Sequence, residues 1–192
     1  MTADWTDYPL FTVVGVGLSS KLSRADAQAR HKHSMAVKEK RKAVLAELTK
    51  RNGIELENSY QCFNDLNVWF RDNISLEPGH DDKLLAEWYS FTTDLNLYMG
   101  DCLIERYPWL RWALQTTSKR ASSYQSSVIR GYRQSEITHV EFNLNFARWG
   151  LAYVTDPHYR ASVFAGAFIN GEDLTAKDRL SIRTAIVESE TR

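Results

Sequence analysis

The sequence predicts an α+β protein in which helices pack on one side of a small antiparallel sheet. After one short strand-like segment, three segments with helical spacing of apolar residues follow, and then a block of further strand-like segments. Helices and strands that come in runs, without strict alternation, are typical of the α+β class. Since 192 residues is an ordinary length for one domain, we expect a single domain over residues 1–192.

The first two predicted elements are a strand and a long basic helix. Residues 9–18 are rich in Val, Phe and Thr and begin with a proline, which a strand tolerates at its first position. Ser20 or Ser23 then precedes a helix over residues 24–51, which the pair Asn52-Gly53 ends. Only the second half of this helix carries an apolar stripe. A helix half that is polar all round is often waiting for a partner.

Two amphipathic helices are expected next, over residues 60–72 and 83–107. The second is apolar on more than one face, so we expect it to be central, with Asp81 or Asp82 favouring its start. Gly100 lies inside it and indicates a close approach of a neighbouring element. The predicted core contains six large side chains: Trp88, Phe91, Leu95, Leu103, Trp112 and Phe142.

The second half of the chain is expected to hold the sheet and a pair of helices. Residues 109–116 and 126–133 are predicted strands, and residues 137–145 alternate polar and apolar side chains as a half-buried third strand does. A helix pair follows at about residues 157–189. Thr175, with Asp178 three residues later, resembles the capping box that begins a helix.

Charge is unevenly distributed along a chain that is neutral as a whole. Residues 24–51 carry nine lysines and arginines against three acidic residues, and residues 52–108 carry three against eleven. One explanation is that the two segments pack against each other. The other is that one of them meets a charged partner.

The basic helix is therefore the leading candidate for a binding surface. We expect a non-enzymatic interaction protein that contacts a protein partner, or a second copy of itself, through this helix. Nucleic acid is the alternative partner, because lysines and arginines also bind phosphates. The residues expected at the contact are Arg30, Lys32, Lys38, Arg41 and Lys42.

An enzymatic alternative rests on four side chains. His139 and Glu141 point to one face of their predicted strand, and with Asp156 and His158 they form a candidate hydrolase or metal site. No motif spacing supports this site, and a solvated sheet face explains the same pattern. No cofactor is expected, because the Gly15-Val16-Gly17 turn lacks the third glycine of a dinucleotide-binding loop.

The N-terminal residues and the cysteines favour the cytoplasm. Asp4 and Asp7 stand where a secretory signal carries basic residues, and the apolar run that follows is too short to span a bilayer. Cys62 and Cys102 are too few for a disulfide framework and are expected to be reduced.

Residues 53–133 resemble a family of small bacterial proteins of unknown function. The resemblance is carried by Gly53-Ile54-Glu55-Leu56, by the run from Leu97 to Ile104, which matches an "LYLGxxL" helix, and by Trp109–Trp112. Gly100 matches the glycine of that family, and Asp101 follows it where the family often has Glu or a small residue. The resemblance implies helices packed on an antiparallel sheet and implies no activity.

Overall fold

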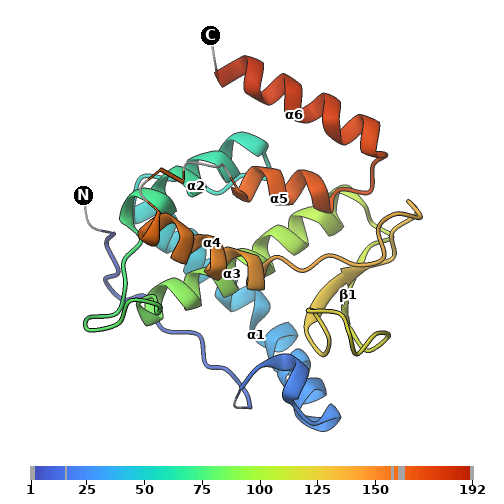
Figure 1. The fold of residues 1–192 in the computed structure, drawn as a ribbon, viewed down its shortest axis with the longest axis horizontal. Coiled ribbons are helices and arrows are strands. Elements are labelled where there is room, and N and C mark those ends of the chain that lie inside the picture. The colour runs from blue at the N-terminus through green and yellow to red at the C-terminus, as the bar shows by residue number, and fades with distance from the viewer. Residues whose placement is uncertain (1–2, 16, 157, 160–162, 191–192) are drawn as a thin grey trace.

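A computed structural model describes residues 3–15, 17–156, 158–159 and 163–190. Within these residues the protein is mainly α-helical, with six α-helices and one two-stranded antiparallel sheet (Figure 1). The α+β prediction is therefore correct only in part. The elements are a 3-10 helix η1 (Ser19–Lys21), α1 (Arg24–Arg51), α2 (Tyr60–Asn73), α3 (Ala86–Arg106), β1 (Arg111–Leu114), β2 (Ser127–Arg130), α4 (Asn143–Thr155), α5 (Val163–Gly171) and α6 (Ala176–Glu190).

Helix α3 is the centre of the fold, as expected from its apolar faces. It packs against α1, α4 and α5, and most of its side chains are buried. Five of the six predicted core residues are buried, and Trp112 is half-buried against the core. The close approach expected at Gly100 is confirmed, and the neighbour is Trp112. The helix begins at Ala86, later than expected, and no side chain caps it, so the capping role expected for Asp81 or Asp82 is wrong.

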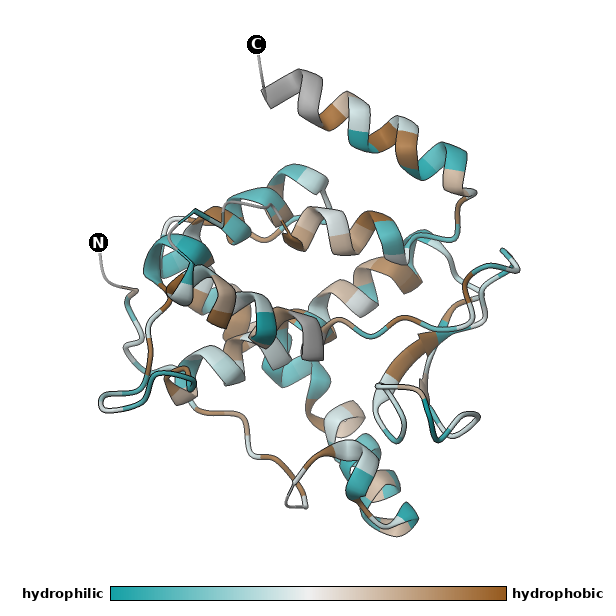
Figure 2. Ribbon diagram, viewed as in Figure 1, coloured by the Kyte–Doolittle hydropathy of each residue, from teal (hydrophilic) through white to brown (hydrophobic). Residues whose placement is uncertain are grey.

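The predicted strand over residues 9–18 is wrong. Residues 4–15 form a strap that passes beside α1 without pairing to a strand in the described part of the chain, and brown in Figure 2 is concentrated at residues 10–14. Its backbone groups are taken by side chains instead. The Phe11 N–H donates to Ser90 Oγ (2.9 Å), and the carbonyls of Pro9 and Val14 accept from Arg41 and Arg30. These side chains satisfy the backbone groups that a neighbouring strand would otherwise pair with, so no ladder of backbone hydrogen bonds forms along the strap.

The two strands expected after α3 are confirmed, and the third is wrong. β1 and β2 are antiparallel, with Trp112 opposite Ile129. Val140 makes only an isolated bridge with Ile129, and the chain then enters α4. Apolar residues from Phe142 onward also recur at helical spacing, and packing of this face against α3 prevails over the short alternation. The helices consequently do not cover one side of a sheet, because the two strands lie at one edge of the bundle (Figure 1).

The remaining helices follow the sequence closely. Ser23 caps α1, Ser59 caps α2, and Thr175 and Asp178 form the expected capping box of α6, with the Asp178 N–H 3.2 Å from Thr175 Oγ1. Part of the start expected for the helix pair lies outside the described residues, and α5 is described from Val163. Figure 1 shows α6 at the rim of the molecule, beside α5.

Candidate functional site

A buried ion pair fixes the middle of α1 to α3. Arg41 donates from Nε and Nη2 to the two carboxylate oxygens of Asp94, at 2.7 and 2.6 Å, and the two residues are 6% and 0% exposed. Arg41 Nη1 also donates to the carbonyl of Pro9 (2.8 Å), and the Tyr8 hydroxyl donates to Asp94 (2.5 Å). Burial beside that carboxylate raises the pKa of Tyr8, which keeps the hydroxyl protonated as a donor. Arg41 is thus an internal residue that joins α1, α3 and the strap.

A second cluster joins α1 to α3 about two turns further along α3. Lys38 and Lys42 each donate to one carboxylate oxygen of Asp101, at 2.7 and 2.5 Å, and Trp112 Nε1 donates to the same carboxylate at 2.9 Å. Burial acts to raise the pKa of Asp101, but these hydrogen bonds outweigh it and hold that pKa below its ordinary value. The negative charge of the acidic segment therefore meets the positive charge of the basic one inside the fold.

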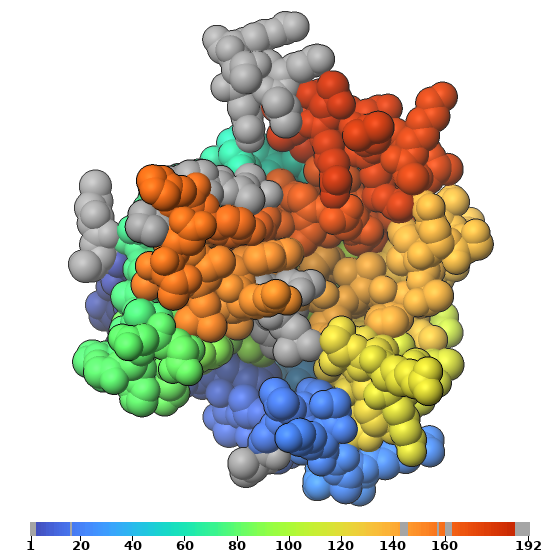
Figure 3. Space-filling view, viewed as in Figure 1, coloured from blue at the N-terminus to red at the C-terminus, as the bar shows by residue number. Residues whose placement is uncertain are grey.

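Arg30 and Lys32 differ from each other in their surroundings. The Arg30 guanidinium donates to the carbonyls of Val14 (2.8 Å) and Gly15 (3.0 Å), so it holds the end of the strap. Lys32 is exposed and makes no ion pair with any described residue. Figure 3 shows the start of α1 (blue) beside the segment between β1 and β2 (yellow), where Gln125 donates to two backbone carbonyls just before the helix. In the polar first half of α1, Arg30 and His31 find partners in the strap and in β2, whereas Lys32 does not.

One face of α1 stays uncovered along its whole length. We call it the outer stripe; its residues recur every three or four positions and all are exposed, and they are Ala25, Ala29, Lys32, Ala36, Lys40, Ala43, Glu47 and Lys50. Half of them are alanines. None of its four charged side chains has an ion pair or hydrogen bond to another residue in the described part of the chain, unlike Arg30, Lys38, Arg41 and Lys42.

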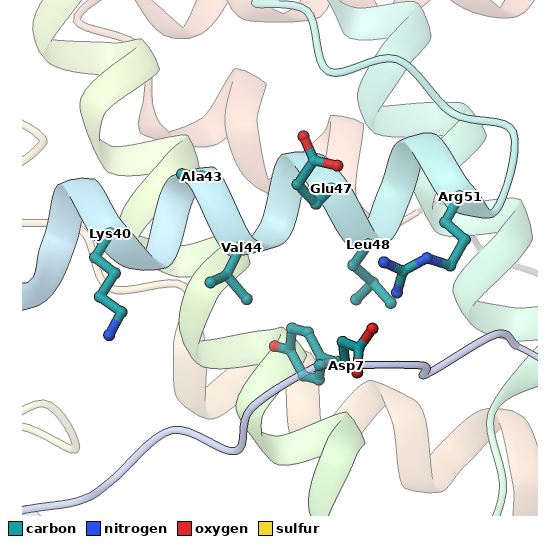
Figure 4. Close-up of a pocket in the computed structure, with 8 residues that line it drawn as sticks. Asp7, Lys40, Ala43, Val44, Glu47, Leu48 and Arg51 are labelled. Atoms are coloured by element: carbon teal, nitrogen blue, oxygen red, sulfur yellow. The ribbon is translucent and has the colours of Figure 1, made fainter.

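A hollow of about 340 Å³ borders the outer stripe where the strap passes α1 (Figure 4). Val44, Leu48 and the Tyr8 ring supply its apolar part, and charged groups of both signs surround it. The charged residues are Asp7, Lys40, Glu47 and Arg51. A second hollow, of about 530 Å³, lies on the other flank of α1 between Lys42 and Tyr98 of α3. Helix α1 is therefore a ridge with a depression on each side.

The structure places His139 in a polar cluster that the sequence did not predict. Its Nε2 lies 2.7 Å from Ser123 Oγ, and its Nδ1 lies 3.0 Å from Thr138 Oγ1 and 3.2 Å from Gln115 Nε2. Burial lowers the pKa of His139 and favours the neutral ring. A serine paired with a histidine is the arrangement of a nucleophile and its base. However, Ser123 is only 4% exposed, and among the described residues the hydrogen-bond partners of the ring are Gln115, Ser123 and Thr138, none of them a carboxylate, so we interpret the pair as the anchor of a loop.

Glu141 is close in sequence to His139 but has a different environment. Burial raises its pKa to about 7, against an opposing hydrogen bond from Ser126. Across β2, His31 Nδ1 lies 2.9 Å from Ser127 Oγ, which links α1 to the sheet. The Glu141–Ser126 and His31–Ser127 contacts therefore both lie at β2.

The four residues of the enzymatic alternative are not brought together. Asp156 is the C-terminal cap of α4 and accepts a hydrogen bond from the backbone N–H of His158. Glu141 precedes the other end of that 13-residue helix, roughly 20 Å away. Within the described part of the chain, no three His, Cys, Asp or Glu side chains gather closely enough to hold a metal ion.

The two cysteines are buried thiols. Burial raises the pKa of Cys62, and it raises that of Cys102 to about 12. Both thiols are therefore protonated at neutral pH, which is unfavourable for a nucleophile.

The sequence analysis offered packing of the acidic segment against the basic helix as one explanation of the charge pattern, and the structure confirms it, but the individual acidic partners were not identified. Asp94 and Asp101 lie seven residues apart, and so on nearly the same face of α3, among apolar neighbours. A carboxylate in such a position needs a cation, and that was the available signal. Tyr8 and Ser123 carried no comparable pattern.

Comparison with known proteins adds no family. None of the helices that the structure describes combines the length and the apolarity that crossing a lipid bilayer requires. No protein-family model, no curated protein and no solved structure matches the chain, so the resemblance of residues 53–133 stays an expectation.

Proposed function

We propose that this protein is a non-enzymatic interaction protein that contacts a protein partner through the outer stripe of α1. The observation that carries the proposal is the stretch from Lys40 to Glu47. There, two charged side chains without an ion pair in the described part of the chain flank an exposed alanine, beside a hollow with an apolar floor. Small residues let another backbone come close, and apolar surface supplies the free energy of association.

The proposal shifts the expected contact surface around the helix. Lys38, Arg41 and Lys42 serve the interior, and Arg30 serves the strap. Of the five residues expected at the contact, Lys32 belongs to the outer stripe.

Protein is favoured over nucleic acid as the partner for reasons of charge. Lys38 and Lys42 form ion pairs with Asp101 and Glu39. The outer stripe carries Glu47 between Lys40 and Lys50, so it presents no continuous positive surface for a phosphate backbone. An interface of mixed charge and small residues suits a protein surface better.

The test uses the immobilised protein to capture partners from its native cells, with and without nuclease. Ala43→Arg places a bulky charge at the centre of the proposed surface. Ala25→Arg is the matched control, because Ala25 is equally exposed on the same helix but far from the hollow. We expect capture that survives nuclease and 200 mM salt, that Ala43→Arg abolishes, and that Ala25→Arg preserves.

Two results would contradict the proposal. Equal capture by both variants would place the contact elsewhere on the molecule. Capture that disappears with nuclease, or that falls by orders of magnitude between about 50 and 200 mM salt, would favour nucleic acid.

A further inference from the structure

The charges of the outer stripe are complementary to themselves. Lys40 and Glu47 are seven residues apart, so their Cα atoms lie within about 20° of each other around α1, although the Lys40 side chain extends toward the strap and the Glu47 carboxylate away from it (Figure 4). Ala43 lies between them, near the midpoint. Along α1 the order of these side chains is positive, small, negative. Along a second copy of the helix that runs in the opposite direction, the order is negative, small, positive.

An antiparallel second helix therefore fits this stripe. With a two-fold axis beside Ala43, Lys40 of each copy lies opposite Glu47 of the other, which gives two identical ion pairs. A parallel arrangement in register would place like charges opposite each other, which is unfavourable. The side chain of Ala43 is small enough for the two backbones to approach at the axis.

The apolar hollow beside the stripe supports the same occupant. Val44 and the Tyr8 ring, both half-buried, lie on the flank of the Lys40–Glu47 segment, where a second helix would shield them from water. Figure 4 shows Lys40, Val44 and Leu48 projecting from α1 on the side of the strap at Asp7. Apolar contact and charge pairing would therefore act at the same place.

We infer that the partner at this face is a second copy of the chain, in an antiparallel α1–α1 dimer held by two Lys40–Glu47 pairs around Ala43. The inference rests on the proposed function and names its partner. A contact between two single helices is smaller than a typical stable interface, so the dimer forms reversibly and depends on concentration.

The experiment is sedimentation equilibrium of the full chain over a range of micromolar to millimolar concentrations. Lys40→Glu and Glu47→Lys each turn both attractive pairs into repulsive ones, and each should weaken self-association by about tenfold to a hundredfold. Mixing these two variants restores opposite charges at both positions, so a heterodimer should form at concentrations where each variant alone is mostly monomeric. The double variant should recover the wild-type constant within a few fold.

Lys32→Glu is the control, because Lys32 lies on the same stripe outside the pairing segment. It should leave the constant unchanged, and thermal denaturation checks that every variant folds. A wild-type chain that stays monomeric at millimolar concentration overturns the dimer, as does a mixture of the two single variants that does not associate.

The two proposals fail separately. If the chain is monomeric but Ala43→Arg still abolishes capture of a different protein, the outer stripe remains a contact surface and only the identity of its partner is wrong. If the chain is monomeric and both alanine variants capture equally, both proposals fail.

Discussion

The indole ring of Trp112 occupies the space into which a side chain at Gly100 would project. A Cβ placed on Gly100 would lie 2.2 Å from Trp112 Cζ2, closer than any van der Waals contact. The same indole donates its N–H to Asp101, so the ring is fixed on both its apolar and its polar side. This contact joins the centre of α3 to β1. It is the basis of the first prediction, and three other buried groups are the basis of the rest.

Gly100→Ala should destabilise the protein by about 1–3 kcal/mol through overpacking. Alanine normally stabilises a helix interior by about 1 kcal/mol relative to glycine, so the expected sign is opposite to the usual one. Gly166→Ala in α5 is the control, because nothing lies within 4 Å of its added Cβ. Urea denaturation measures both variants. A gain in stability for Gly100→Ala would show that Trp112 moves aside without cost.

Arg41→Met should cost about 3–5 kcal/mol, because it leaves the Asp94 carboxylate buried without its cation. The double variant Arg41→Met with Asp94→Leu removes both charges and should be more stable than Arg41→Met alone. Urea midpoints of the wild type and the three variants give this comparison as a double-mutant cycle. If the two single losses simply add, the pair does not act as a unit.

The stability of the folded state should fall as pH rises through the pKa of Glu141. Its folded pKa of about 7 lies above the ordinary value of 4.5, so the folded protein binds this proton more tightly than the unfolded chain does. The contribution is complete below about pH 4.5 and is lost as pH rises through 7, with an upper limit of about 3 kcal/mol.

Glu141→Gln removes this titration and isolates the effect. The free energy of unfolding of the variant, relative to that of the wild type, should rise from pH 5 to pH 8. Urea denaturation at both pH values measures this change. Glu55→Gln, at an exposed carboxyl group, serves as the control. A Glu141→Gln difference that does not change with pH would mean that Glu141 titrates alike in the two states.

Asn67→Ala should loosen α5 and cost about 1–3 kcal/mol. The Asn67 side chain is 1% exposed, and its Oδ1 accepts from the backbone N–H of Val163 (3.0 Å) and from the Tyr153 hydroxyl (3.1 Å). Without it, the first turn of α5 has a buried donor without a partner. Hydrogen exchange at the α5 amides should accelerate more than exchange in α3. Tyr153→Phe, which removes only the hydroxyl, should cost about 1 kcal/mol.

The helices could be predicted from the sequence because their signals are local. The Ser23 cap, the apolar stripe of α2 and the Thr175–Asp178 box each lie within a few residues of the element that they define. The strand expected at residues 9–18 failed because composition alone supplies no neighbouring strand. Contacts with Arg41 and Ser90 decide the structure of this segment, and no local pattern in the sequence identifies such distant partners.

The sequence analysis placed the candidate surface on α1, and the structure moves the candidate to a different face of the same helix. An excess of lysine and arginine marks α1 as unusual, and that feature is real. Charge counting cannot separate Lys38, which faces Asp101, from Lys40, which faces water. The separation depends on how α1 is rotated against α3, and this rotation is fixed by the buried carboxylates.

The strap has a consequence for the order in which the protein folds during synthesis. Tyr8 and Phe11 contact residues that lie 86 and 79 positions later in the chain. The strap therefore leaves the ribosome well before α3 exists, and for that interval Tyr8 and Phe11 lack the surface that covers them in the folded protein. An extended apolar segment in this position is a natural binding site for a chaperone. The strap therefore cannot close over α1 and α3 until the central helix has been synthesised.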